Sequence, residues 1–308
     1  MQQRSPDWDE LTRLLPGLEH KRKSSVADLL KFARLYRACC TDLSLASAFR
    51  LSRPEQHRLE ELVARGHSVL YSIPRRTFRD VAHFIFSIVP QAIRRDIFVR
   101  ICVPLFYGSF LICGGISYYS KPFAENVAGA AVLESYREMH EGGHDTVTLG
   151  DMVGASGFYI ANNVGLNLLT FGLGALLGIG SLFFCLYNGI FLGTIIGHLL
   201  TTPARDNILS WVVAHAPFEL TAIGFSAAAG MRIGFALVTP GARTYLLAVR
   251  EEAIASLPAL FSAAMLTFFA AFIEAFLGPL HADMKLKIGI GSASALLMIS
   301  YFFLGGRK

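Results

Sequence analysis

The feature that most constrains this chain is a run of 53 residues, 152–204, without a single Asp, Glu, Lys or Arg. A straight helix of that length would measure about 80 Å, whereas the hydrocarbon core of a bilayer is about 30 Å thick. The run must therefore cross a membrane twice, and a cluster of glycines between 172 and 180 marks the turn. The whole chain of 308 residues is 53% hydrophobic and 17% charged, which is also typical of a membrane protein.

Hydropathy divides the rest of the membrane part in the same way, because each crossing needs roughly 20 apolar residues. The predicted fold class is an all-α polytopic membrane helical bundle preceded by an N-terminal cytoplasmic helical domain. Residues 208–216, which include Trp211, form either an interfacial segment or a re-entrant one, and Pro217 then starts a span. Six spans are expected, at about 101–120, 157–176, 181–202, 217–238, 254–277 and 288–304.

Charge is distributed unevenly along the chain. Residues 1–100 hold 18 Lys and Arg against 11 Asp and Glu, whereas residues 101–308 hold 10 against 12. We therefore divide the chain into a basic cytoplasmic domain, 1–97, and a transmembrane domain, 98–308. Basic residues stay on the cytoplasmic side, so Arg94, Arg95 and Arg232 are expected at the inner ends of spans. Six spans then place both termini in the cytoplasm, and the net charge of +5 indicates orientation rather than nucleic-acid binding.

The N-terminal domain has helical patterns. Ser25 with Asp28 and Ser52 with Glu55 are capping pairs at the starts of two helices. A third segment, 77–89, has an apolar face flanked by arginines, so it either lies on the inner membrane surface or packs within the cytoplasmic bundle. The apolar faces of the first two helices are Leu29, Phe32, Leu35, Tyr36 and Cys39, and Leu59, Leu62, Val63 and Leu70.

One motif suggests a metal site. The sequence from His140 and Glu141 to His144 fits H-E-x-x-H, which on a helix would hold zinc and activate water. Gly142 and Gly143, however, together cost about 2 kcal/mol of helix propensity in the stretch that must be helical. No third ligand follows in the same loop, so we rank a membrane zinc protease last among the hypotheses. We expect no enzymatic activity, no metal and no cofactor.

Polar residues within the spans are more informative, because each is costly in hydrocarbon and usually faces a partner or a wet cavity. His215 and Glu219 are four residues apart and so share a helix face. With six spans, Asn162, Asn163, His215, Glu219 and Glu274 fall in the outer half of the bilayer and suggest a shared cluster. Two interpretations stay open: interhelical hydrogen bonds of about 0.6–2 kcal/mol each, or a functional cavity. The full set of polar intramembrane candidates is Asn162, Asn163, Asn167, Asn188, His215, Glu219 and Glu274.

Small residues recur at four-residue spacing in the spans. The pairs are Gly189 and Gly193, Ala222 and Ser226, and Gly230 and Gly234. Such spacing lets helix backbones approach closely. It favours tight packing within one subunit at least as well as a homo-oligomer, and both remain open.

The order of these motifs resembles the stage II sporulation protein M family, in the longer form found in non-sporulating bacteria. The chain departs from the usual family pattern at Ala214 and Ala216, which flank His215. The N-terminal third is also similar to that form. The motifs are Asn162-Asn163, Phe171-Gly172-Leu173-Gly174, Tyr187-Asn188-Gly189 with Gly193, His215-x-x-x-Glu219, Ala228-Ala229-Gly230 through Gly234, and Ala270-Ala271-Phe272-Ile273-Glu274.

The resemblance implies a multi-pass protein of the bacterial cytoplasmic (inner) membrane. It also implies a non-enzymatic scaffold in a cell-envelope complex. Its expected partners are membrane lipids, envelope or peptidoglycan-remodelling proteins and an ATPase of the MoxR type, with no nucleic acid. The alternative is a transporter or lipid scramblase that uses the polar cluster as a path.

Overall fold

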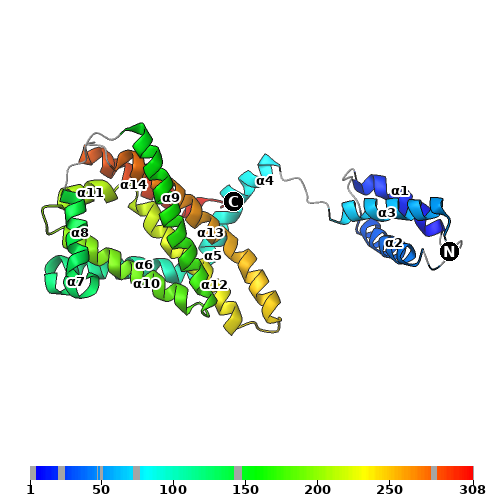
Figure 1. The fold of residues 1–308 in the computed structure, drawn as a ribbon, viewed down its shortest axis with the longest axis horizontal. Helices are drawn as coiled ribbons and strands as arrows, with labels where there is room; N and C mark the ends of the chain where they lie inside the picture. The colour runs from blue at the N-terminus through cyan, green and yellow to red at the C-terminus, as the bar shows by residue number, and fades with distance from the viewer. Residues whose placement is uncertain are drawn as a thin grey trace. The chain divides into compact units, whose positions relative to one another are not determined.

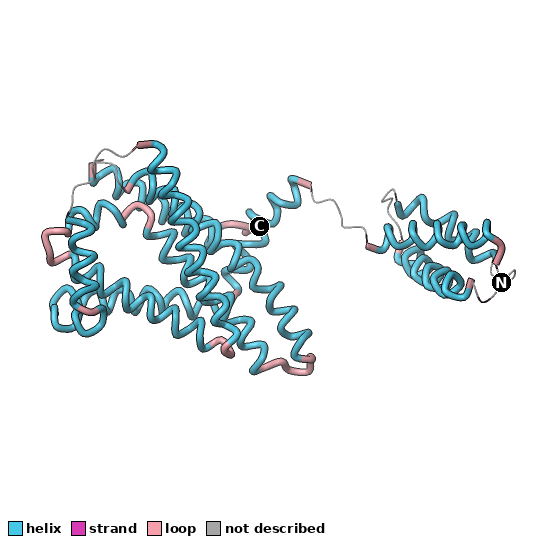
Figure 2. The backbone as a smooth tube through the Cα atoms, in the orientation of Figure 1, coloured by secondary structure: helices cyan, strands magenta, loops and turns pink. Residues whose placement is uncertain are grey.

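The computed structural model describes residues 5–19, 25–46, 48, 51–71, 77–141, 148–278 and 283–307. Within these residues the chain is helical and has no strand, as predicted (Figure 2). The chain divides into two compact units, Met1–Thr77 and Phe78–Lys308. Figure 1 shows the helices of each unit.

The N-terminal unit consists of α1 (Ser5–Glu19), α2 (Val26–Leu45) and α3 (Arg53–Leu70). Both expected capping pairs are present, and the hydrogen bond from the Ser25 hydroxyl holds the pKa of Asp28 below its usual value. The indole of Trp8 donates a hydrogen bond of 2.9 Å to the buried carboxylate of Asp42. The core of this unit is formed by Trp8, Leu11, Leu15, Phe32, Leu35, Cys39, Leu59 and Leu62.

The second unit begins earlier than the boundary that we placed at residue 97. It opens with α4 (Phe78–His83), the π-helical turn η2 (Phe84–Ile88) and α5 (Val89–Arg95). The hydroxyl of Tyr301 donates to the carbonyl of Ile85 at 2.6 Å, and Arg94 donates to the carbonyl of Phe302 at 2.7 Å. These bonds to the last helix explain why the segment packs with the membrane unit.

The segment expected at 77–89 therefore packs in part against the membrane unit rather than within the N-terminal one. The ring centroids of Phe84 and Phe261 are 5.5 Å apart, and Val89 is fully buried. Phe78 and Phe86, by contrast, are 88% and 64% exposed. A position of α4 on the membrane surface stays a prediction.

Five helices are both long and apolar enough to cross a membrane, among the residues described. They are α6 (Ile97–Tyr119), α10 (Ile179–Leu199), α12 (Ala216–Val238), α13 (Tyr245–Leu277) and α14 (Met284–Leu304). The expected sixth span lies in α9 (Leu149–Gly172), which is long enough but is not among the five. Asn162, Asn163 and Asn167 lower its hydropathy, so the count of six is not matched.

Shorter elements connect these helices. The turn η3 (Leu173–Ala175) and Gly178, which has a φ of +83°, reverse the chain between α9 and α10, within the glycine cluster. The helices α7 (Lys121–Ala128) and α8 (Ala130–Glu141) follow α6, and α11 (Arg205–Val212) precedes α12. Residues 208–216 are thus the end of α11, a turn at 213–215 and the first residue of α12.

Glycines bring the membrane helices into backbone contact. A β-carbon on Gly193 of α10 would lie 2.2 Å from the carbonyl oxygen of Phe110 on α6. On α12, a β-carbon on Gly230 would lie 2.4 Å from the carbonyl oxygen of Phe171. A β-carbon on Gly234 would lie 2.2 Å from the carbonyl oxygen of Gly174. The small-residue pairs therefore serve packing within one chain.

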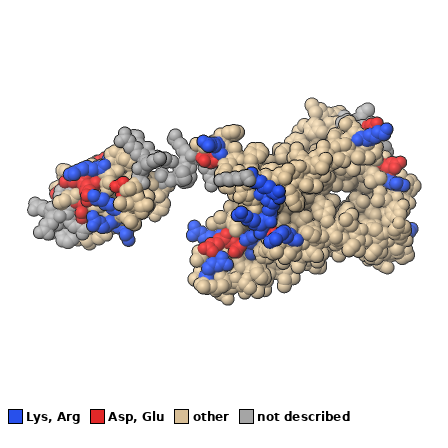
Figure 3. All heavy atoms as spheres, turned by 180° about the vertical axis from the view of Figure 1, so that it is seen from behind, with Lys and Arg blue, Asp and Glu red and all other residues tan. Residues whose placement is uncertain are grey.

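Charged residues meet where α6 begins, α12 ends and α13 begins. The guanidinium of Arg232 lies 3.1 Å from Asp96 and 2.6 Å from Glu252. Arg95 is exposed. The space-filling view shows charged side chains gathered on part of the membrane unit, with a wide uncharged surface elsewhere (Figure 3). Which side of a membrane this end faces stays a prediction.

Gly193→Ala is expected to destabilise the membrane unit by about 1–3 kcal/mol, because the added methyl forces α6 and α10 apart. Thermal unfolding of the purified protein in detergent measures the change. Gly165→Ala is the control, since a β-carbon there meets nothing within 4 Å. Equal stability of the two variants would contradict the packing argument.

Candidate functional site

Three ionisable side chains meet between α12 and α13. One donor atom from each of His215, Glu219 and Glu274 lies within 4.8 Å of the others. The Nε2 atom of His215 is 3.4 Å from Oε2 of Glu219. We call these three residues the His–Glu cluster.

The local sequence explains how α12 contributes two of the three. Pro217 stands in the first turn of the helix, where its fixed φ favours helix initiation. His215 is the N-cap residue, and its carbonyl accepts hydrogen bonds from the amides of Phe218 at 3.0 Å and Glu219 at 3.2 Å. The four-residue spacing then places both side chains on one face.

Two further contacts fix the cluster in place. The indole of Trp211 on α11 donates a hydrogen bond of 3.2 Å to Oε1 of Glu274. The turn before His215 lies against α14, where a β-carbon on Gly291 would be 2.2 Å from the carbonyl oxygen of Val213. The cluster is therefore held by four helices.

The cluster is buried and incompletely hydrogen-bonded. His215 is 4% exposed and Glu274 is 9% exposed. The Oε2 atom of Glu274 has no hydrogen-bond partner. Among the described residues, no Lys or Arg forms an ion pair with Glu219 or Glu274. Two carboxylates thus face each other and a histidine without a permanent cation.

The side chain of Glu219 keeps 25% of its surface exposed. Helix α12 begins at the edge of the ring formed by α8, α10 and α11 (Figure 1). The space-filling view shows a hollow in the membrane unit (Figure 3). Glu219 is the most exposed member of the His–Glu cluster.

The asparagines do not join the cluster through hydrogen bonds. Asn162 is exposed and donates to Asn163 at 3.0 Å, while Asn163 is 7% exposed. Asn167 donates to Thr267 of α13 at 2.6 Å. Asn188 donates to the carbonyl of Phe184 in its own helix at 2.7 Å. Of the five residues expected at similar depth, the structure brings together the three charged or ionisable ones.

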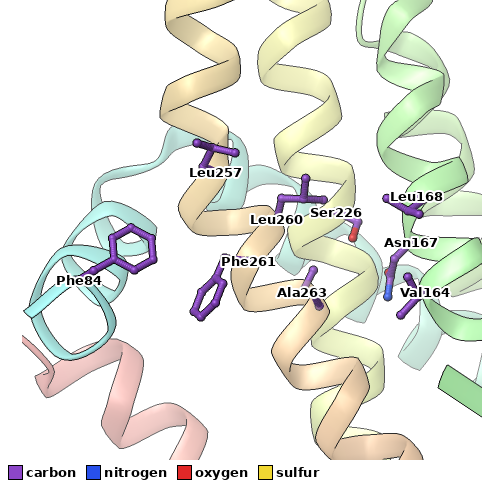
Figure 4. A pocket seen from close by; sticks show the side chains of 10 residues that line it. Phe84, Val164, Asn167, Leu168, Ser226, Leu257, Leu260, Phe261 and Ala263 are labelled. Carbon is purple, nitrogen blue, oxygen red and sulfur yellow. The ribbon is translucent and has the colours of Figure 1, made fainter. Parts of the chain in front are cut away.

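Asn167 also lines an apolar pocket of about 460 Å³. Figure 4 shows its walls, formed by α9, α12 and α13 with Phe84 beside them. The Oδ1 atom of Asn167 and the hydroxyl of Ser226 are buried without partners. Apart from these two, the lining is hydrocarbon, so the pocket fits an acyl chain better than a headgroup.

The described half of the H-E-x-x-H motif has other partners. Helix α8 ends at Glu141, whose carboxylate pairs with Arg137. His140 Nδ1 lies 2.9 Å from the carbonyl of Tyr136. His144 lies outside the described residues, so the motif as a whole stays a hypothesis.

Sequence reasoning missed residues around the cluster. It places Trp211 in an interfacial or re-entrant segment without linking it to Glu274. It does not single out Tyr159 of α9, which lies within electrostatic range of both carboxylates. Lys287 is 1% exposed and donates to the hydroxyl of Ser210 at 2.8 Å and the carbonyl of Gly278 at 3.0 Å. The sequence signal for this contact is a lysine within an otherwise apolar helix, because such a lysine usually has polar partners.

A comparison with protein families identifies the membrane part. The family model for Stage II sporulation protein M matches residues 103–279, more than half of the chain. The chain belongs to the Stage II sporulation protein M family. A second model, Domain of unknown function (DUF8413), matches residues 1–72. No curated protein and no solved structure matches the chain.

The family match includes the His–Glu cluster, since His215, Glu219 and Glu274 all lie within residues 103–279. It also includes the glycines that pack α10 and α12. The second match covers the N-terminal helical unit and ends before α4. One match thus lies in each compact unit, and the membrane-family match covers residues 103–279 of the second.

Trp211→Phe is expected to weaken the protein by about 0.5–2 kcal/mol, because it removes the donor to Glu274. A double-mutant cycle with Glu274→Met, which has no side-chain oxygen to accept from the indole, isolates the pair by thermal unfolding in detergent. The Trp211 substitution should cost less in a chain that already carries Glu274→Met than in the wild type. Equal costs in both backgrounds would show that the hydrogen bond does not stabilise the cluster.

Proposed function

We propose that this membrane protein acts as a scaffold in a cell-envelope complex, with the N-terminal unit as its docking module. The observation that carries the proposal is an apolar patch at the start of α2. Val26, Leu29 and Leu30 are 73%, 50% and 68% exposed, although the unit has a separate core. Apolar side chains grouped on a polar domain are typical of a protein-binding surface.

The sequence assigned Leu29 to the core face of this helix, and its exposure alters that assignment. The buried stripe of α2 begins at Phe32 and continues through Leu35 and Cys39. Val26, Leu29 and Leu30 follow the i, i+3, i+4 pattern of a helix face. The first turns of α2 therefore present an apolar face that the unit does not use itself.

The resemblance to the sporulation family supports a partner among envelope proteins. Peptidoglycan-remodelling proteins or a MoxR-type ATPase are the partner classes that it implies. A docking unit with its own core, joined to a polytopic membrane unit, suits the recruitment of such a partner to the membrane. The cytoplasmic location of both termini, in a bacterial inner membrane, is part of the same proposal.

The triple variant Val26→Ser, Leu29→Ser and Leu30→Ser tests this function. Affinity purification from native membranes should recover a partner with the wild type and at least tenfold less with the variant. Burial of three exposed apolar side chains supplies several kcal/mol of binding free energy. A tenfold change in affinity corresponds to about 1.4 kcal/mol. Quantitative mass spectrometry gives the ratio.

Gln56→Ser with Glu60→Ser is the matched control, because both positions are exposed on α3 of the same unit. This control should leave recovery unchanged. Identical partners with the wild type, with the triple variant and with a chain that starts at residue 78 would contradict a docking role.

A second candidate function is transport or lipid scrambling through the membrane unit. The observation in its favour is the partial exposure of the Glu219 side chain, in a helix that is long and apolar enough to cross a membrane. A carboxylate in that position would interact with the polar headgroup of a lipid, while the apolar surface around it would accommodate the chains. This candidate does not need the α2 patch.

Proteoliposomes that contain a fluorescent lipid test the second candidate. The purified chain should speed flipping above protein-free vesicles, and Glu219→Gln should reduce that rate severalfold. Glu125→Gln is the control, because its carboxylate belongs to α7, outside the His–Glu cluster, and pairs with Lys121 of the same helix. Flipping no faster than in empty vesicles would reject this function.

A further inference from the structure

The His–Glu cluster has the donor types and spacing of a metal site. The separation of 3.4 Å between His215 Nε2 and Glu219 Oε2 is close to the ~3.3 Å that separates two ligands of a tetrahedral ion with bonds of about 2.0–2.1 Å. The third donor, on Glu274, is within 4.8 Å of the other two. A shift of the Glu274 carboxylate by at most about 1.5 Å would bring all three donors to the spacing of a tetrahedral ion.

Charge balance points in the same direction. Two carboxylates in an apolar bundle repel each other, and burial of isolated charges is strongly unfavourable. Among the described residues they have no lysine or arginine as an ion-pair partner, and the histidine is neutral when it ligates a metal. A divalent cation between Glu219 and Glu274 would neutralise these two carboxylates, whereas the ammonium of Lys287 is hydrogen-bonded to Ser210 and Gly278 instead.

The unpartnered atoms are a second, independent sign of a ligand. Glu274 is 9% exposed, and its Oε2 has no hydrogen-bond partner while its Oε1 accepts from Trp211. Metal-bound carboxylates usually have such an arrangement, in which an outer donor orients the group and the other oxygen faces the ion. The indole would then act as an outer positioning group.

The ligand set selects the class of ion. Calcium takes six to eight oxygens, and magnesium demands near-octahedral oxygen coordination, neither of which one imidazole and two carboxylates provide. Imidazole with carboxylates suits first-row transition ions. We propose that His215, Glu219 and Glu274 bind one divalent transition ion of the Zn²⁺ class, with a further coordination position that these three side chains leave open.

This site differs from the H-E-x-x-H motif, which uses His140, Glu141 and His144. It also goes beyond the scaffold function, because it needs neither the α2 patch nor a protein partner. Both proposals can therefore fail or succeed separately. The open position would allow a bound water or a polar group of a lipid to approach the ion.

The experiment uses the full chain, purified in detergent, stripped with a chelator and titrated with Zn²⁺ and with Co²⁺ as a spectroscopic probe. The wild type should bind one equivalent, and the absorption of Co²⁺ should show nitrogen and oxygen ligands without a thiolate band. Glu219→Gln and Glu274→Gln should each lower the affinity at least tenfold. Zn²⁺ should raise the thermal midpoint of the wild type but not of these variants.

Glu125→Gln is the control and should bind as the wild type does. Circular dichroism and gel filtration establish that the two glutamine variants are folded, and an unfolded variant is replaced by His215→Gln. Failure of the folded wild type to bind either ion would overturn the proposal. Unchanged binding in both glutamine variants, or a thiolate band in the Co²⁺ spectrum, would also overturn it. Loss of metal binding in the single variant His140→Ala would overturn it as well.

Discussion

Close backbone contact between helices is the constraint on which the membrane unit depends. Lipid chains are as apolar as leucine, so helices in a bilayer associate through packing and hydrogen bonds rather than through the hydrophobic effect. Gly193 and Gly197 of α10 lie directly against the carbonyls of Phe110 and Gly114 on α6, and Gly230 of α12 lies against Phe171. The first two contacts hold α10 against α6, and the third holds α12 against the end of α9.

That burial is what makes the His–Glu cluster tolerable. Helix α12 packs against α6, α9, α10 and α13, so a polar face at its start meets protein rather than lipid. The hydrogen bond from Trp211 and the contact of Gly291 with the turn fix the side chains further. A cluster that only held the bundle together would satisfy all of its atoms, yet Glu274 Oε2 is unpartnered. This difference favours a ligand over a purely structural role.

The sequence was sufficient for the parts of the fold that rest on local rules. The glycine cluster predicted the turn after α9, the two serine caps predicted the starts of α2 and α3, and the spacing of His215 and Glu219 predicted a shared face. The sequence did not predict how each helix is rotated about its own axis. A mostly apolar helix has no distinct polar face from which its orientation can be read. The sequence therefore did not predict that Asn162 would be exposed and Asn163 buried.

Long-range packing limited the rest of the prediction. The boundary at 97 missed α5, whose place beside α14 depends on bonds between residues more than 200 positions apart, such as Arg94 with Phe302. Glu274 meets His215 for a comparable reason, since only the pairing of α12 with α13 brings the end of one helix to the start of the other. Hydropathy identifies His215 and Glu274 as costly residues within spans. Their contact, however, depends on how α12 and α13 pack, and the sequence pattern does not reveal that packing.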